Sequence, residues 1–342
     1  MTTHDQDERH AAQPDGGGSP AATGPGNTAV FTYVDPRTGE ETHLTRVSGP
    51  GLPHVEYQVW ADLRAAEVPA SNVVAVHTDL SPSSLPGGYT INALRAGFPN
   101  AALSSGHSYG TDPAERAQGV AALTAQVESM AQLTGQAPPP RPHRVPLPEP
   151  DPAASAPTLS AELPGNLPVQ VYGTELLASA ALPDAARAFL ASPGLPADVR
   201  FFFTADRPDN PPRGGLFVDA ATHLRELGAE LTPAAADILS AHTRLGTDGQ
   251  YIVTVQQEAG SVWAANPATG SGRYVNASVA AFAHCLATLA TTRELMVGMN
   301  PYEAGSTVAD LQARLIALDP TCFDDADNWW SVIIEQMWHG LF

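Results

Sequence analysis

Apolar positions in the first part of the chain switch between strand-like and helix-like spacing. Val55, Val59 and Leu63 recur at helical spacing, whereas the apolar runs around them are short and bounded by turn-forming residues. The expected elements are strands at 29–34 and 42–47, a helix at 55–63, a strand at 73–76, a helix at 85–98, a strand at 101–109 and a helix at 113–133. The order β-β-α-β-α-β-α predicts a three-layer α/β sandwich.

The second part of the chain has an α+β pattern. The expected elements are a helix at 184–190, a strand at 200–204, paired strands at 251–255 and 260–264, and helices at 279–289 and 329–342. The last helix carries one apolar stripe that contains Trp330 and Trp338, so these two residues are expected to be buried. Trp329 lies off that stripe and is therefore the candidate partner-binding residue, because tryptophan is enriched at interface hot spots.

Two segments lack any apolar periodicity. Residues 1–27 are rich in Gly, Pro and polar residues and are expected to be a disordered tail. Residues 137–156 contain a run of prolines and are expected to form a semi-rigid linker. This division gives two domains, at 28–136 and 157–342, and predicts that the two fold independently.

Composition and charge narrow the class of partner. The 342 residues include 17 basic and 36 acidic residues, with no lysine, and the formal net charge is −19. Such a charge repels nucleic acids and anionic membranes, whereas it speeds encounter with a basic protein. Two cysteines are too few for a disulfide framework, and no apolar run is as long as a membrane helix or a signal peptide requires. We therefore expect a cytoplasmic protein with no membrane partner.

The sequence His54-Val55-Glu56 begins the first expected helix. A zinc deaminase needs a histidine ligand and a glutamate proton shuttle at such a place, and two cysteine ligands in the next αβ unit. Residues 78–90 read TDLSPSSLPGGYT, which resembles the T-E-x-x-P-C-x-x-P-x-x-Y-C motif of deaminases from bacterial polymorphic toxin systems. The resemblance covers about 29–135.

That resemblance implies His54 as a metal ligand and Glu56 as the acid/base, but it places Ser83 and Thr90 at the two cysteine positions. Neutral hydroxyls are weak zinc ligands beside thiolates. We therefore expect degenerate deaminase positions, no catalytic residue, no bound metal and no cofactor.

The second domain resembles the SUKH-4-type immunity proteins. The resemblance rests on short motifs in family order, which are DAARAFL at 184–190, GLP at 194–196, FFF at 201–203, LGTDG at 245–249, VNAS at 275–278, LDP at 318–320, WW at 329–330 and GL at 340–341. The family implies an α+β fold that neutralises toxins by direct binding.

Three functions follow from these observations. The first is an immunity or antitoxin-like pseudoenzyme of a polymorphic toxin system, whose partner is a protein toxin that is basic or of nuclease or deaminase type. The second is an active nucleic-acid or nucleotide deaminase that tolerates Ser83 and Thr90. The third is a housekeeping binding module. The sequence leaves the toxin, the binding face and the oligomeric state open.

Overall fold

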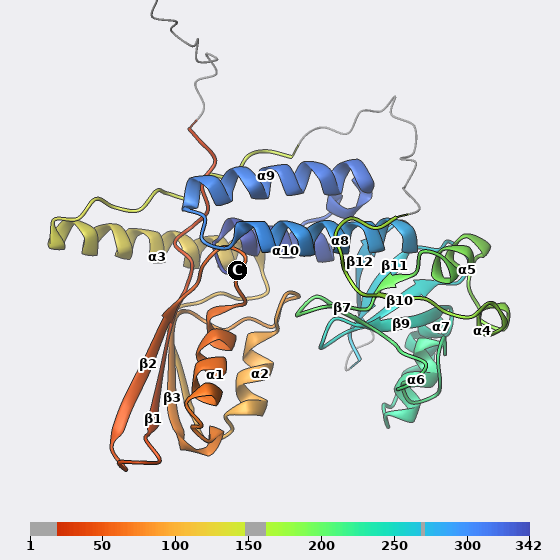
Figure 1. Cartoon of the computed structure of the whole chain (residues 1–342), viewed down its shortest axis with the longest axis horizontal. Helices are drawn as coiled ribbons and strands as arrows, with labels where there is room; N and C mark the ends of the chain where they lie inside the picture. Colours follow the sequence, from red (N-terminus) through yellow and green to blue (C-terminus); the bar gives the residue numbers. More distant parts are fainter. Residues whose placement is uncertain (1–18, 148–161, 268–270) are drawn as a thin grey trace, which may run out of the picture.

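The computed structural model describes residues 19–147, 162–267 and 271–342 (Figure 1). We call residues 19–147 the N-terminal half and residues 162–342 the C-terminal half. The expectations for residues 1–18 and for residues 148–156 of the linker fall outside the described residues.

The N-terminal half is built on a four-stranded sheet with strand order β2-β1-β3-β4. Its elements are β1 (Thr28–Val34), β2 (Glu41–Val47), α1 (Val55–Ala65), the short 3₁₀ helix η1 (Ala70–Asn72), β3 (Val73–Leu80), α2 (Thr90–Gly97), β4 (Ala102–His107) and α3 (Pro113–Thr134). Strand β1 pairs antiparallel with β2 and β3, and β3 pairs parallel with β4. The predicted order of strands and helices is confirmed, whereas the three-layer sandwich stays a prediction.

Local sequence explains these elements. Every second residue of β1 is buried, with Phe31 fully covered by the core, because β1 is a central strand with one face on α1. Val55, Val59 and Leu63 form the buried face of α1, as their spacing predicts. Helix α3 begins at an Asp112 cap, whose carboxylate accepts hydrogen bonds from two backbone amides.

The C-terminal half contains a six-stranded antiparallel sheet with strand order β12-β11-β10-β9-β8-β7. Its strands are β5 (Val169–Gln170), β6 (Leu195–Pro196), β7 (Asp198–Val199), β8 (Phe203–Ala205), β9 (His242–Thr247), β10 (Ile252–Gln256), β11 (Val262–Ala265) and β12 (Gly272–Asn276). Its helices are α4 (Thr174–Ala178), α5 (Asp184–Ala191), α6 (Ala220–Glu226), α7 (Pro233–Ser240), α8 (Val279–Met296), α9 (Pro301–Leu318), η2 (Pro320–Phe323) and α10 (Trp329–Trp338).

Residues with positive φ delay the start of two predicted elements. The helix expected at 329–342 also ends earlier, at Trp338. The strand expected at 200–204 is only β8, because Phe201 has a φ of 74° and residues 200–202 form a turn. The helix expected at 85–98 begins at Thr90, because Gly87 and Tyr89 have φ values of 98° and 49°. Phe201 and Tyr89 both lie beside the candidate site described below, and both have a positive φ.

One of the hydrophobic clusters spans both halves, and we call it the shared core. Leu85 and Tyr109 of the N-terminal half belong to the same buried cluster as Trp338 and Phe342 of the C-terminal half. Helix α10 contributes the strongest polar link, since Glu335 accepts hydrogen bonds from the buried Arg116 guanidinium at 2.6 and 3.0 Å. The N-terminal half also has a buried cluster of its own, which includes Phe31, Val59 and Leu94. Independent folding of the two halves therefore stays a prediction, although the halves that the proline-rich segment separates in sequence are packed together.

Part of the expected tail is also packed. Ala22 is buried and pairs with His143, and the Asn27 side chain hydrogen bonds to the backbone N–H and C=O of Leu80 at 2.9 and 3.2 Å. The Gly24 amide donates to the Trp338 carbonyl at 2.7 Å. The disordered tail predicted for 1–27 is therefore wrong for residues 22–27, which make contacts with both halves.

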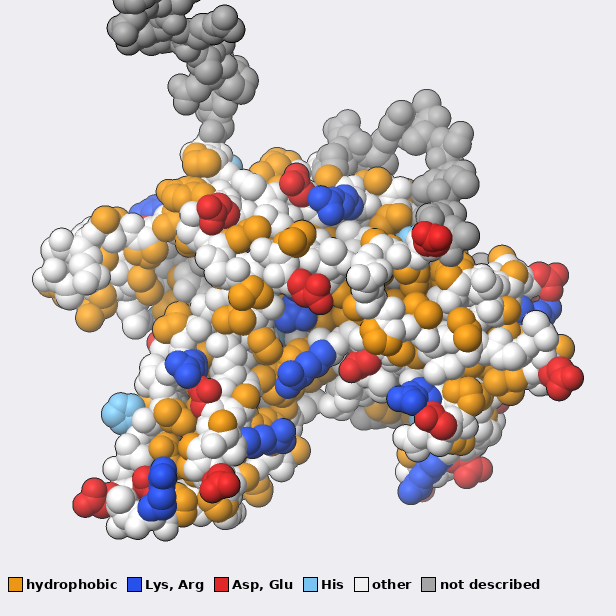
Figure 2. Space-filling model, in the orientation of Figure 1, with side chains coloured by type: hydrophobic (Ala, Val, Ile, Leu, Met, Phe, Trp, Pro, Cys, Tyr) orange, Lys and Arg blue, Asp and Glu red, His pale blue; other side chains and the backbone are white. Residues whose placement is uncertain are grey.

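Among the described residues, no helix combines the length and the apolar composition that crossing a membrane requires. On the face shown in Figure 2, basic and acidic side chains are interspersed over both halves.

Candidate functional site

The four degenerate deaminase positions come together at one end of α1 and α2. His54 precedes α1, Glu56 lies in its first turn, Ser83 follows β3 and Thr90 is the first residue of α2. The Ser83 amide donates a hydrogen bond of 3.0 Å to Thr90 Oγ1. The four residues predicted from the deaminase motif are therefore close together in the structure. We call His54, Glu56, Ser83 and Thr90 together the closed site.

A glycine turn allows this approach. A Cβ atom on Gly88 would lie 2.8 Å from His54 Cδ2, so only glycine fits against the ring. The Tyr57 hydroxyl donates a short hydrogen bond to the Gly88 carbonyl and fixes the turn. The sequence Gly87-Gly88, which interrupts the expected helix, is thus a condition for the geometry of the closed site.

The closed site is almost completely covered. His54, Glu56, Ser83 and Thr90 are 5, 3, 4 and 1% exposed. Within the described chain, neither His54 Nε2 nor Glu56 Oε2 has a hydrogen-bond partner. Leaving a polar atom without a hydrogen bond at this depth is costly.

Burial controls the protonation of both groups. It lowers the pKa of His54 to about 3, with a smaller contribution from the nearby Arg293 cation. It raises the pKa of Glu56 to about 7, although hydrogen bonds with the backbone and with the Thr90 side chain partly offset this. His54 is therefore neutral at physiological pH, and Glu56 is held near the midpoint of its titration.

The residues of the closed site do not fit the zinc ion that a deaminase requires. One imidazole and two neutral hydroxyls supply no thiolate, and the Thr90 hydroxyl already accepts the Ser83 amide. Across the described ranges, no group of three or more His, Cys, Asp or Glu side chains is placed to hold a metal ion.

The space over His54 is filled by a side chain of the C-terminal half. The Phe342 ring lies 4.8 Å from the His54 ring and 5.5 Å from that of Phe202, centroid to centroid. Phe342 also lies within 3.2 Å of where a Gly87 Cβ would be, and it is 1% exposed. Sequence analysis missed this contact, because nothing in the apolar pattern indicates that Phe342 packs on the other half.

Trp329 does not lie on the surface. It is fully buried, and its indole Nε1 donates to Asp248 Oδ2 at 3.1 Å, the oxygen that also accepts the Tyr89 hydroxyl at 2.6 Å. The assignment of Trp329 as a partner-binding residue is therefore corrected: it packs at the junction of the halves. Trp330 and Trp338 are buried as the stripe predicts.

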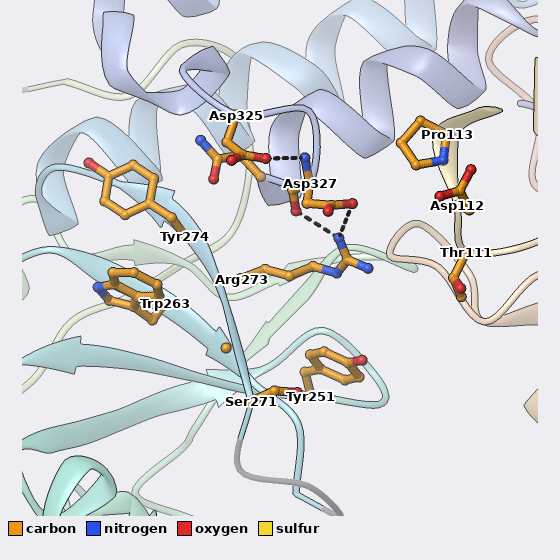
Figure 3. Close-up of a pocket in the computed structure, with 12 residues that line it drawn as sticks. Thr111, Asp112, Pro113, Tyr251, Trp263, Ser271, Arg273, Tyr274, Asp325 and Asp327 are labelled. Atoms are coloured by element: carbon orange, nitrogen blue, oxygen red, sulfur yellow. Dashed lines mark hydrogen bonds and ion pairs between the residues drawn. The ribbon is translucent and has the colours of Figure 1, made fainter.

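An open groove lies on another side of this junction (Figure 3). It encloses about 590 Å³. Its walls come from the start of α3, from Tyr251 just before β10, from β11 and β12, and from the segment before α10. Asp325 and Asp327 are exposed there, whereas Asp319 is buried and accepts hydrogen bonds from the Asn276 side chain and the Ala277 amide. Sequence analysis missed this groove, because nothing in the local pattern indicates that Asp112 lies across from Asp325 and Asp327.

The buried cysteines carry no sign of reactivity. Cys285 and Cys322 are both fully covered, and burial raises the pKa of each thiol.

Comparison with known families gives two matches. The family described as SUKH-4 immunity protein matches residues 162–336, and the family described as Xanthomonas-like deaminase matches residues 24–126. The curated proteins and the solved structures give no match. The deaminase match contains all four positions of the closed site, and the SUKH-4 match contains Trp263, Arg273 and Asp327 of the groove. Because the SUKH-4 match covers more than half of the chain, the chain belongs to the SUKH-4 immunity protein family and carries a deaminase-like domain before its SUKH-4 domain.

Proposed function

We propose that this chain is a cytoplasmic immunity protein of a toxin system and that it neutralises a protein toxin by direct, stoichiometric binding. The observation that carries the proposal is the SUKH-4 immunity match over residues 162–336, joined to a deaminase-like site that is closed. Binding a toxin requires an exposed surface but no reactive group. The open groove supplies such a surface.

The chemistry of the closed site supports a pseudoenzyme. A working deaminase must admit a nucleobase and activate a water on zinc. Here the donor set lacks both thiolates, and Phe342 fills the space against His54. The N-terminal half, as a three-layer deaminase scaffold, then serves to support the C-terminal half through their shared core.

The most direct test uses the full chain in bacterial cells. We expect co-expression to protect against a toxin encoded beside its gene, and the purified pair to form a one-to-one complex. Glu56→Gln should protect equally well, because proton transfer by Glu56 has no part in binding. Failure of the folded wild-type chain to protect against any neighbouring toxin would overturn the proposal.

One observation favours a second function. His54 and Glu56, the ligand and proton shuttle of the deaminase motif, are both retained and lie in one site. A working deaminase predicts release of ammonia from cytidine or adenosine nucleotides, or from single-stranded DNA, and loss of that activity in Glu56→Gln. The net charge of −19 disfavours nucleic-acid substrates, because it repels their phosphates.

A further inference from the structure

The lining of the groove at the junction combines aromatic side chains with carboxylates. Its aromatic lining consists of Tyr251, Trp263 and Tyr274, which are all partly exposed. Its carboxylates are Asp112, Asp325 and Asp327, which are all exposed. Asp112 comes from the N-terminal half and the other five from the C-terminal half, so the groove exists only when the two halves are packed together.

The aromatic lining is held in place by its neighbours. Trp263 lies edge-on to Tyr274 with ring centroids 5.3 Å apart, and its Nε1 donates to Ser261 Oγ at 3.0 Å. The Tyr251 ring stacks on Tyr89 at 5.5 Å, across the junction. Rigid aromatic rings bind a partner at a low cost in conformational entropy, because little side-chain motion remains to be lost.

The charge in the groove is predominantly negative. Arg273 is the one basic residue among those that line it within the described ranges, and its guanidinium donates to the Asp327 carbonyl at 2.7 Å and lies 3.6 Å from its carboxylate (Figure 3). Asp112 and Asp325 form no ion pair with it and accept only backbone amides of their own turns. Two carboxylates across from one another thus stay available to a cation.

We propose that this groove is the toxin-docking surface and that it receives an arginine-bearing segment of the toxin. The planar guanidinium of arginine suits both kinds of side chain in the lining. It stacks on aromatic faces, and it pairs with carboxylates through two hydrogen bonds. The proposal rests on the proposed function. It also gives the deaminase-like domain a role, because Asp112 and the Tyr89 support for Tyr251 both belong to it.

The experiment uses the full chain and a defined probe, an acetylated (Gly-Arg)₄ amide, with (Gly-Gln)₄ as its neutral counterpart. The groove variant is Asp112→Asn/Asp325→Asn/Asp327→Asn, which keeps the capping hydrogen bonds because asparagine caps as well as aspartate. The matched variant is Glu175→Gln/Asp184→Asn/Asp209→Asn, which removes the same charge from exposed residues outside the groove. Asp209 is a close match to Asp327, since both side chains are 66% exposed and paired to an arginine.

Isothermal titration calorimetry should show that the groove variant binds the arginine peptide about tenfold more weakly or worse. The matched variant should stay within about twofold of wild type, because long-range charge alone is screened at physiological salt. Trp263→Ala should also weaken binding, whereas the glutamine peptide should bind none of the proteins. Equal weakening in the two triple variants, or none in the groove variant, would overturn the proposal.

Co-expression with the neighbouring toxin separates this proposal from the function on which it rests. If wild type protects and the folded groove variant does not, both stand. If wild type and the groove variant protect equally, the groove proposal is overturned while the function stands. If wild type does not protect, the function fails and the toxin role of the groove fails with it.

Discussion

The closed site and the groove hold similar inventories of polar and aromatic groups but differ in their access to solvent. In the closed site, His54 and Glu56 are 5 and 3% exposed, and the Phe342 ring packs on His54, whereas the Asp327 side chain in the groove is 66% exposed. The residues of the deaminase motif lie in the interior, whereas residues outside that motif form the open surface. The proposed function therefore depends on access to solvent as well as on the residue types of a motif.

The largest effect expected from this comparison concerns the contact that joins the halves. Glu335→Ala should lower the free energy of unfolding by about 3–5 kcal/mol, because it leaves the fully buried Arg116 guanidinium without its carboxylate. The matched change is Glu128→Ala, since Glu128 pairs with Arg141 at the same 2.6 Å but at an arginine that is 78% exposed. Its cost should stay below about 1 kcal/mol. Denaturant unfolding of both variants measures the difference, and equal costs would contradict a shared core.

A second pair of changes contrasts a buried tryptophan with an open one. Trp329→Ala should cost about 3–5 kcal/mol of stability, because it opens a cavity and leaves Asp248 without an indole donor. Trp263→Ala should cost distinctly less, because its side chain is only partly buried. The order should reverse in the affinity for the arginine peptide. Thermal melts of both variants rank their stabilities, and titrations with the arginine peptide rank their affinities. A stable Trp329→Ala protein with weakened binding would instead support a role of Trp329 in binding the partner.

Acid should weaken the junction through His339. Burial, followed by the Arg116 and Arg144 cations, lowers the pKa of His339 to about 3, and Tyr109 hydrogen bonds to its Nδ1 at 2.9 Å. The unfolded chain takes up a proton near the ordinary pKa of 6.5 while the folded chain does not, so this contribution to stability is lost as the pH falls from 6.5 toward 3.

The measurement compares wild type with His339→Gln at pH 7 and pH 5. Wild type should lose on the order of 2 kcal/mol more than the variant over that range. The same loss in both proteins would mean that His339 is not the titrating group.

The smallest expected effect is that of removing metal. Chelation should leave the melting temperature unchanged, because the closed site offers no thiolate to hold zinc. Metal analysis should find far less than one zinc per chain. About one zinc per chain that disappears in His54→Ala would contradict this reading of Ser83 and Thr90.

Hydrophobic periodicity and short motifs predicted several features of the structure. The order of elements in the N-terminal half and the apolar stripes of α1 and α10 follow from local spacing. The identity of the degenerate positions follows from the resemblance to the deaminase motif. The proximity of His54, Glu56, Ser83 and Thr90 could be inferred from the motif alone. Their burial could not, because the Phe342 ring that packs on His54 comes from the other end of the chain.

The remaining features depend on packing between distant segments. Ala22 pairs with His143, although local composition indicates a tail and a linker for these two regions. Arg116 pairs with Glu335, although local composition indicates solvated helix faces. Trp329 lies off the stripe of its own helix, yet it is buried because a second surface, at the junction, covers the opposite side of α10. A helix that is buried all round cannot be recognised from one stripe.

Protection of cells by full-length variants tests the central claim, that the chain acts by binding at the open groove and not by chemistry at the closed site. Wild type, Glu56→Gln and the groove triple variant would be expressed at equal levels with the toxin encoded beside the gene. The account predicts full protection by wild type and Glu56→Gln and its loss in the folded triple variant. Loss of protection in a folded Glu56→Gln protein, with protection kept by the triple variant, would contradict it.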